Sequence, residues 1–237
     1  MGQGIQQAPV QQSGGGSALL DVVKVLYEPT QVFERVRERP NFLAPYLAMC
    51  VVQVVVFFVN MPFLRAAMAA QFAARPAGGP DPSKFLWIGG VFIPVGIAIA
   101  LLIGGFLLWV LVSLLGSEAK FGRLLSVAAY SAVPSVILLV LIGTIVLHVQ
   151  GISQITSPQD MQPALGLDLL APGTRGFMGA ALKAINPFSI WGLVLSAIGV
   201  STTHRLSKGT GYAVATIAFF VGVLIAGVFG LFGPRAG

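Results

Sequence analysis

The chain has 237 residues, of which 56% are hydrophobic and only 9% are charged. Soluble domains carry about 25% charged residues, so this composition excludes an ordinary water-soluble globular fold. The formal net charge of +6 does not indicate nucleic-acid binding, because the basic residues are scattered at the ends of apolar segments and form no cluster.

The N-terminal part of the chain is polar. Residues 1–17 are rich in Gln and Gly and show no apolar periodicity, which predicts a disordered tail. Residues 18–41 are predicted to form two short amphipathic helices, the second beginning at Pro29 because proline suits a first helical turn. We expect both helices to lie along the membrane surface, with Phe33 and Val36 facing lipid or a protein partner. The alternative is a solvated helix that packs on the loops of the bundle.

Five apolar segments without a charged residue follow. The first, residues 42–64, is 23 residues long, and a bilayer core of about 30 Å requires about 20 helical residues to cross it. In lipid the backbone must satisfy its own hydrogen bonds, so such a segment predicts a spanning helix. The other four predicted spans cover residues 85–115, 124–149, 187–203 and 212–232.

These segments predict an all-α fold, a polytopic membrane bundle of five transmembrane helices over residues 42–233 with an N-terminal amphipathic surface helix. The span over residues 85–115 is long for a perpendicular crossing, so it requires a tilt or a break near Gly89 and Gly90 or at Pro94.

The orientation is predicted from the lysines and arginines. The two short loops at residues 116–123 and 204–211 lie on the N-terminal side and carry four basic residues. In the long loops at residues 65–84 and 150–186, the basic residues are spread over more positions. We therefore expect a cytoplasmic N-terminus and a C-terminus on the opposite side, in the plasma (inner) membrane if the source is prokaryotic. The 150–186 loop is expected to be either functional or disordered.

Small residues recur at every fourth position in two of the spans. Such stripes let another helix approach closely, which holds membrane bundles together. We expect them to pack within the molecule, and homo-oligomerisation is the alternative. The two stripes consist of Gly96, Ala100, Gly104, Gly222, Ala226 and Gly230.

Two polar side chains, Gln53 and Asn60, share a face of the first span because they are seven residues apart. Each is expected to form a hydrogen bond to a neighbouring helix, and a solute pathway is the alternative interpretation. His148 is one turn beyond Thr144 near the end of the third span. A lone histidine in that position is more often structural than a ligand or a proton relay.

The types of residue that are missing argue against catalysis and ion pumping. None of the five segments contains Asp, Glu, Lys or Arg, although ion-coupled pumps usually need a buried ionisable group. No carboxylate or histidine set has metal-binding spacing, and Cys50 is the single cysteine. A dyad of His148 with Ser126, Ser131 or Ser135 is compatible with residue counts, but nothing places a serine beside the histidine. We expect neither an enzyme nor a cofactor.

Three stretches resemble the Yip (Ypt/Rab-interacting protein) domain family, in particular its prokaryotic-type members. They are Pro29–Phe33 leading to Pro40, Phe121–Tyr130 with Pro134 just after, and Asn186–Trp191 running into Gly199. The residues that carry the resemblance include Tyr130, Pro134, Asn186, Pro187, Phe188 and Trp191.

This resemblance covers about residues 18–232 and implies a five-span membrane fold with a cytoplasmic N-terminus. The eukaryotic members are Golgi and endoplasmic-reticulum proteins associated with small GTPases. The Asp-Leu-Tyr-Gly-Pro type motif of those members is absent before the first span, so GTPase binding is not implied here. Fold transfers better than function within such a family.

The favoured function is a non-enzymatic membrane scaffold or adaptor that contacts membrane lipid and binds a protein partner through its N-terminal cytoplasmic segment. The alternative is a small-solute permease or a lipid-translocating bundle. That alternative rests on Gln53 and Asn60 on one face and on Pro94 and Pro134 as helix breaks. The partner and the solute are not identified by the sequence.

Overall fold

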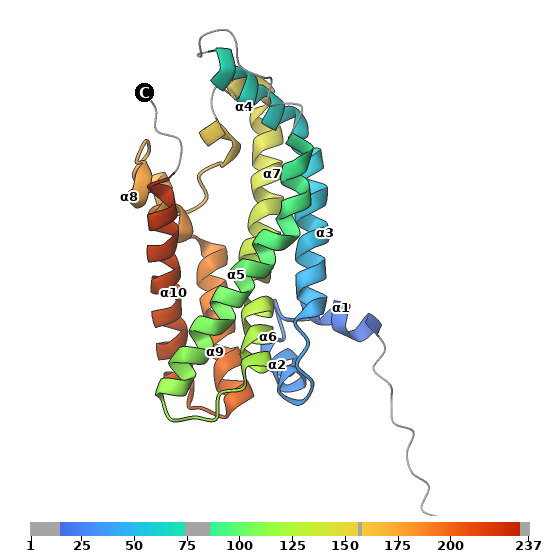
Figure 1. Ribbon diagram of the computed structural model, residues 1–237, viewed down its shortest axis with the longest axis vertical. Helices are drawn as coiled ribbons and strands as arrows, with labels where there is room; N and C mark the ends of the chain where they lie inside the picture. Colours follow the sequence, from blue (N-terminus) through green and yellow to red (C-terminus); the bar gives the residue numbers. More distant parts are fainter. Residues whose placement is uncertain (1–14, 74–85, 156–157, 233–237) are drawn as a thin grey trace, which may run out of the picture.

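The computed structural model describes residues 15–73, 86–155 and 158–232, and within these residues the fold is helical without a strand. Its long helices run along one axis (Figure 1). The α-helices are α1 (Gly15–Lys24), α2 (Pro29–Glu38), α3 (Leu43–Val59), α4 (Met61–Ala73), α5 (Leu86–Leu114), α6 (Phe121–Ser131), α7 (Leu139–Gln150), α8 (Gly176–Ala184), α9 (Pro187–His204) and α10 (Lys208–Gly230). The shorter elements are a π-helix, η2 (Pro134–Leu138), and three 3₁₀ helices, η3 (Ile152–Gln154), η4 (Pro158–Met161) and η5 (Leu167–Leu170).

The predicted bounds of the N-terminal segments differ slightly from the bounds of the helices. Residues 1–14 of the predicted disordered tail lie outside the described residues, as does residue 233. Residues 15–17, which we assigned to that tail, belong to α1. The second predicted amphipathic helix agrees with α2, which has Pro29 in its first turn.

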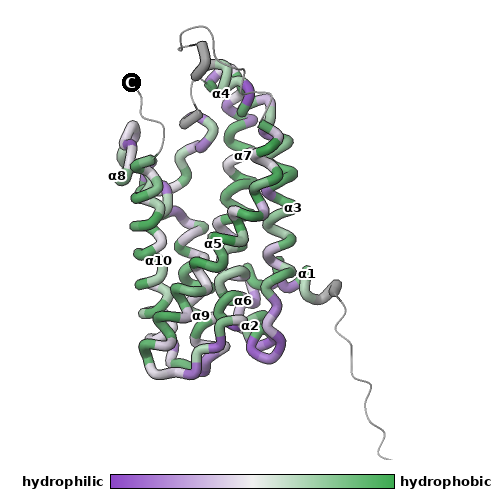
Figure 2. Tube along the Cα trace, in the orientation of Figure 1, coloured by the Kyte–Doolittle hydropathy of each residue, from purple (hydrophilic) through white to green (hydrophobic). Residues whose placement is uncertain are grey.

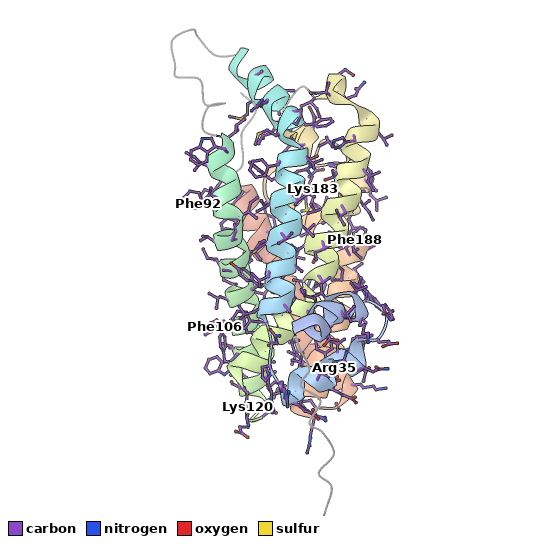
Figure 3. All side chains as sticks on the ribbon, turned by 90° about the vertical axis from the view of Figure 1, so that its right-hand side faces the viewer. Arg35, Phe92, Phe106, Lys120, Lys183 and Phe188 are labelled. Carbon is purple, nitrogen blue, oxygen red and sulfur yellow. The ribbon has the colours of Figure 1, made fainter. Side chains whose placement is uncertain are left out.

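The apolar helices are able to span a membrane. Three segments of the described chain, Leu86–Leu114, Phe121–Gln150 and Lys208–Gly230, are long and apolar enough. Two bent pairs, Leu43–Val59 with Met61–Ala69 and Gly176–Ala184 with Pro187–His204, raise the number to five if each pair is one span. The spans are hydrophobic along their length, and hydrophilic residues gather around α2 and the loops at the same end (Figure 2). Phe92 and Phe106 project outward from α5 (Figure 3).

The first predicted span is bent, contrary to the single helix expected over residues 42–64. α3 ends at Val59, and α4 begins at Met61 with a bend of 55° between them. Pro62 explains the break, because it has no N–H to donate to the carbonyl of Phe58 one turn earlier. By contrast, α5 continues through Pro94 without interruption and crosses the bundle obliquely (Figure 1). Of the two ways in which we expected this long span to be accommodated, a tilt or a break, the structure shows the tilt.

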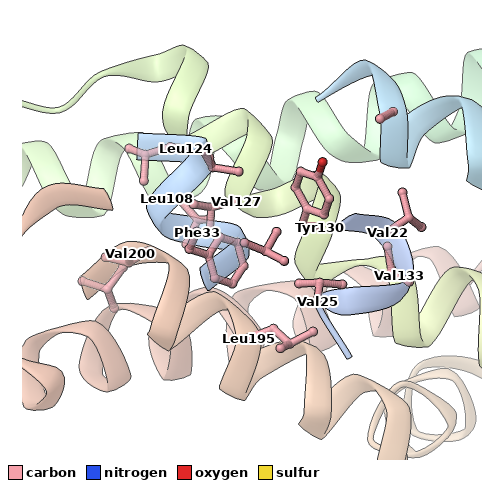
Figure 4. Packing of buried hydrophobic residues seen from close by; sticks show 14 of the residues in the cluster. Val22, Val25, Phe33, Leu108, Leu124, Val127, Tyr130, Val133, Leu195 and Val200 are labelled. Atoms are coloured by element: carbon pink, nitrogen blue, oxygen red, sulfur yellow. The ribbon is translucent and has the colours of Figure 1, made fainter. Parts of the chain in front are cut away.

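The N-terminal helices, the α5–α6 loop and the α9–α10 loop lie at one end of the bundle, and α10 ends at the other (Figure 1). α2 is inserted at the first end, where it packs against α6 and α9. Phe33 is 0% exposed and meets the ring of Tyr130 edge-on, with ring centroids 6.5 Å apart (Figure 4).

This position of α2 corrects the expectation that Phe33 and Val36 lie on the membrane surface. Both side chains are buried in the main hydrophobic core, which also contains Val25, Leu195 and Val200. A helix with one apolar stripe must cover that stripe with some apolar partner. Here the partner is the bundle itself, as in the alternative interpretation, although α2 packs on helices and not on loops.

Candidate functional site

α1 is fixed to α2 by a paired hydrogen bond between a carboxylate and a guanidinium. Arg35 donates from Nε to Asp21 Oδ2 at 3.0 Å and from Nη2 to Asp21 Oδ1 at 2.6 Å. Asp21 is 9% exposed, so its charge requires such a partner. The hydrogen bond from Arg35 to Asp21 raises the pKa of Arg35 above its ordinary value, against the opposing effect of burial. A bidentate pair of this kind sets orientation as well as distance.

The exposed apolar surface of the N-terminal segment lies on α1, not on α2. Val22 and Val25 face the core, whereas Leu19, Leu20 and Val23 are more than half exposed. α1 extends sideways from the foot of α3 (Figure 1), and Leu43 and Leu47 of α3 are exposed as well. We name the group Leu19, Leu20 and Val23 the α1 apolar face, and Tyr27 in the turn after α1 is exposed as well. The sequence contains one indication of this face, because apolar residues occur on both sides of this short helix.

The two polar residues of the first span both bond to the third span, which confirms the predicted interhelical hydrogen bonds. Gln53 Nε2 donates to the carbonyl oxygen of Val136 at 3.1 Å. Asn60 Nδ2 donates to Thr144 Oγ1 at 3.0 Å. Asn60 lines a cavity of about 320 Å³ that Gln53 does not line, so the two side chains do not share one pathway there.

The described part of the 150–186 loop is folded. It contains η3, η4, η5 and α8, and Leu167 N–H donates to the carbonyl of Ile185 at 3.0 Å. Asp168 is buried and accepts a hydrogen bond from Gly166 N–H at 2.9 Å. Asp168 and Lys183 line the same cavity as Asn60, so this loop closes over one end of the bundle.

The small-residue stripes face open space more than they face other helices. A Cβ on Gly96 or Gly222 would have no neighbour within 4 Å, and one on Gly104 would be 3.7 Å from the Cβ of Ala128. Ala226 is half-buried, and only Gly230 is in close contact, because its Cβ would lie 2.5 Å from the carbonyl oxygen of Gly176. The expected close packing is therefore found at one end of one stripe. Elsewhere the stripes line a cavity of about 570 Å³, to which Gly96, Ala100, Gly104 and Gly222 contribute.

Approaches as close as that of Gly230 also occur at glycines outside the two stripes. A Cβ on Gly211 of α10 would lie 2.5 Å from the carbonyl oxygen of Ala197 of α9. One on Gly192 would lie 2.8 Å from the carbonyl oxygen of Ser131. Gly211 lies between Ser207 and Ala215, and Gly192 precedes Ser196, each at four-residue spacing, but these small-residue repeats were not among the stripes we singled out.

The residues that carry the family resemblance shape helix ends and the core. Asn186 Oδ1 accepts from the amides of Phe188 at 3.1 Å and Ser189 at 3.0 Å, and Pro187 follows it as the first residue of α9. This is a capping box, which starts a helix at a defined residue. Phe188 is half-buried and Trp191 is 38% exposed. In the third span, Tyr130 belongs to the core and Pro134 begins η2.

Among the described residues, no serine forms a hydrogen bond with His148. Its Nδ1 is 2.9 Å from the carbonyl oxygen of Thr144, and its ring lies 4.7 Å from that of Phe63. Ser126 and Ser135 donate to backbone carbonyls of Gly122 and Ala132. Within the described residues, no group of three His, Cys, Asp or Glu residues is placed to hold a metal ion.

Comparisons with known proteins match most of the chain. A family model described as the Yip1 domain matches residues 23–231. "Membrane protein YknW" of Bacillus subtilis (strain 168) is 29% identical over 229 residues, which are 93% of this chain and 92% of that protein. No solved structure matches the chain.

Proposed function

This chain belongs to the Yip1 domain family, and we propose that it is a non-enzymatic membrane scaffold whose bundle holds α1 in the membrane interface. The α1 apolar face carries this proposal, because its side chains are exposed while the helix itself is fixed. The Asp21–Arg35 pair and the buried Val22 and Val25 prevent α1 from turning this face inward. An amphipathic helix with such a face lies in the boundary between headgroups and acyl chains.

The arrangement of the loops supports a cytoplasmic position for this end. The short basic loops and the N-terminal helices are on the same side of the bundle (Figure 1), and basic residues in short loops favour the cytoplasmic side. A fixed interfacial helix at the cytoplasmic surface gives a scaffold a defined place at which lipid or a protein partner is held.

Replacing Leu19, Leu20 and Val23 together by serine tests the scaffold. We expect α1 to lose its contact with lipid, because burial of each of these side chains contributes about 1.5–3 kcal/mol. The measurement is quenching of a fluorophore attached at Tyr27→Cys by lipids with brominated acyl chains. Co-purification in mild detergent, followed by mass spectrometry, is measured on the same variant.

The matched control is Gln31→Ser with Glu34→Ser, two exposed polar positions on α2. Quenching lost in the triple variant and kept in the control supports the interfacial position. Unchanged quenching together with an unchanged set of co-purified proteins would contradict the proposal. A protein lost only from the triple variant would identify a partner that occupies the same face.

Lipid translocation is the second candidate, and the cavity of about 570 Å³ between α5, α9 and α10 favours it. The cavity is lined mainly by apolar and small residues, and Ser131 Oγ at its wall is buried without a hydrogen-bond partner in the described residues. A cavity beside the lipid phase with a hydroxyl group in its wall suits a lipid in transit.

Filling this cavity with Gly96→Leu and Gly222→Leu is expected to slow translocation, because both positions have open space in front of them. The rate is measured as the movement of a fluorescent phospholipid across liposomes, and it should fall toward that of protein-free liposomes. Val95→Leu, an exposed neighbour that does not line the cavity, should leave the rate unchanged. Wild-type liposomes that are no faster than protein-free ones would remove this candidate.

A further inference from the structure

A third cavity, polar and of about 400 Å³, lies at the end of the bundle that carries α2. Four parts of the chain line it: the end of α2, the loop between α5 and α6, the first turn of α6, and the end of α9 with the residue that follows it. Lys120 and Arg35 mark this end in Figure 3. A cavity of this size has room for a small polar group and the organic moiety attached to it. The lining residues are Arg37, Glu38, Ser117, Glu118, Lys120, Arg123, Thr203, His204 and Arg205.

Positive charge predominates in this cavity, with four lysine or arginine side chains against two glutamates. Glu118 pairs with Lys120 at 3.6 Å, and both side chains are largely exposed. The side chains of Arg37, Arg123 and Arg205 form no hydrogen bond or ion pair within the part of the chain that the structure describes. Three guanidinium groups without a partner in one cavity favour an anion, and their planar donors suit phosphate in particular.

The backbone adds positive potential to the same place. α6 begins beside the cavity, with Lys120 as its N-cap residue, and no side chain caps this N-terminus. The amides of Arg123 and Leu124 donate to the carbonyl oxygen of Lys120, and a Cβ on Gly122 would meet nothing within 4 Å, so the first turn is open on that side. The first amides of a helix carry partial positive charge, which attracts anions.

His204 holds the α5–α6 loop against α9 through its neutral ring. Lys120 N–H donates to His204 Nε2 at 3.3 Å. Thr203 Oγ1 donates to the carbonyl of Gly199, so it accepts from the Nδ1–H of His204 at 2.9 Å. Both ring nitrogens are therefore used, and the histidine positions the cationic residues on either side of it.

Arg205 adopts a backbone conformation that favours glycine. Its φ is 53° and its ψ is 36°, and it is the one non-glycine residue with positive φ among the described residues. Glycine is the usual residue at this point after a helix, because a Cβ is strained there. An arginine that occupies a strained position beside a cavity indicates that its side chain is needed there.

We propose that this cavity binds a phosphate-bearing anion between Arg37, Arg123 and Arg205. Two sources supply such a group, the headgroup of an anionic lipid and a soluble phosphate ester. Leu114 is 77% exposed and immediately precedes the α5–α6 loop, so apolar surface continues to the edge of the cavity. The site is separate from the α1 apolar face and does not depend on it.

The test compares wild-type protein with Arg123→Gln/Arg205→Gln. Binding of phosphatidylglycerol is measured by native mass spectrometry after release from nanodiscs of phosphatidylglycerol and phosphatidylcholine. Binding of glycerol 3-phosphate and inorganic phosphate is measured by calorimetry in detergent. We expect the bound species to lose about tenfold in affinity for each guanidinium removed. Arg39→Gln, which removes an exposed charge at the same end but does not line the cavity, should bind as wild type.

The lipid and soluble probes distinguish a lipid headgroup from a soluble phosphate ester, and the variants show whether either one binds in this cavity. Phosphatidylglycerol binding that glycerol 3-phosphate does not displace assigns the headgroup, and binding of glycerol 3-phosphate alone assigns a soluble ester. Equal affinity of wild type and the double variant for every probe would overturn the proposal, as would an equal loss in Arg39→Gln. Arg205→Gly serves as the folding control, because it should raise the thermal midpoint and still weaken binding.

Discussion

Replacing Phe33 with alanine is expected to lower the free energy of unfolding by about 3–5 kcal/mol. The Phe33 ring is fully buried between α6 and α9 and meets Tyr130 edge-on. Its removal leaves a cavity that the helix backbones on either side cannot close. Because α2 carries few other apolar residues, the loss also weakens the docking of the whole N-terminal segment. Equilibrium unfolding in mixed micelles with an increasing fraction of SDS measures the effect.

Two control variants test whether the loss of stability comes from the buried ring of Phe33. Phe33→Leu keeps most of the apolar volume and should cost less than half as much. Glu34→Ala, at an exposed position one residue further, should change the stability by less than about 0.5 kcal/mol. If Phe33→Ala were as mild as Glu34→Ala, α2 would not be docked in the bundle, and its apolar side would face lipid as first expected.

Gly211→Ala is expected to destabilise the protein by about 1–3 kcal/mol, even though alanine favours a helix. The new Cβ would lie 2.5 Å from the carbonyl oxygen of Ala197 and 3.0 Å from the Cβ of Ser201. The backbone of α9 cannot rotate away as a side chain does, so α9 and α10 must separate. This overpacking outweighs the gain of about 1 kcal/mol in helix propensity.

Gly222→Ala, on the same helix, is expected to have the opposite sign. Nothing lies within 4 Å of its new Cβ, so the gain of roughly 0.5–1 kcal/mol from replacing a helical glycine remains. The same unfolding assay measures both variants. Equal destabilisation by the two substitutions would show that Gly222, too, is in close contact, within the molecule or in an oligomer.

The positions of the apolar helices could be predicted from the sequence because hydrophobicity and proline act locally. An uncharged stretch long enough to cross a bilayer has few other structures open to it. Asn186 followed by Pro187 begins α9, and Pro29 begins α2, since caps and first turns depend on adjacent residues. The hydrogen bonds of Gln53 and Asn60 were predictable as a type, because a polar group in lipid needs a partner.

Whether lipid or protein contacts the apolar side of α2 could not be predicted, because an apolar stripe has the same sequence pattern in both cases. Phe33 and Val36 satisfy either arrangement, and their partner, α9, is more than 150 residues away in the chain. The contact at Gly211 depends on a carbonyl of another helix. The basic cavity joins Arg37 to Arg123 and Arg205, which the sequence leaves far apart.

The docking of α2 against α9 has a consequence for how the protein is made. α2 is synthesised early, but α9 is complete only when the ribosome has added Val200 and the residues after it. At 5–20 residues per second this delay is on the order of ten seconds. During that interval the apolar stripe of α2 has no core to enter, and the membrane surface is the nearest apolar medium. We therefore expect α2 to rest on the bilayer during synthesis and to enter the bundle only when α9 is in place.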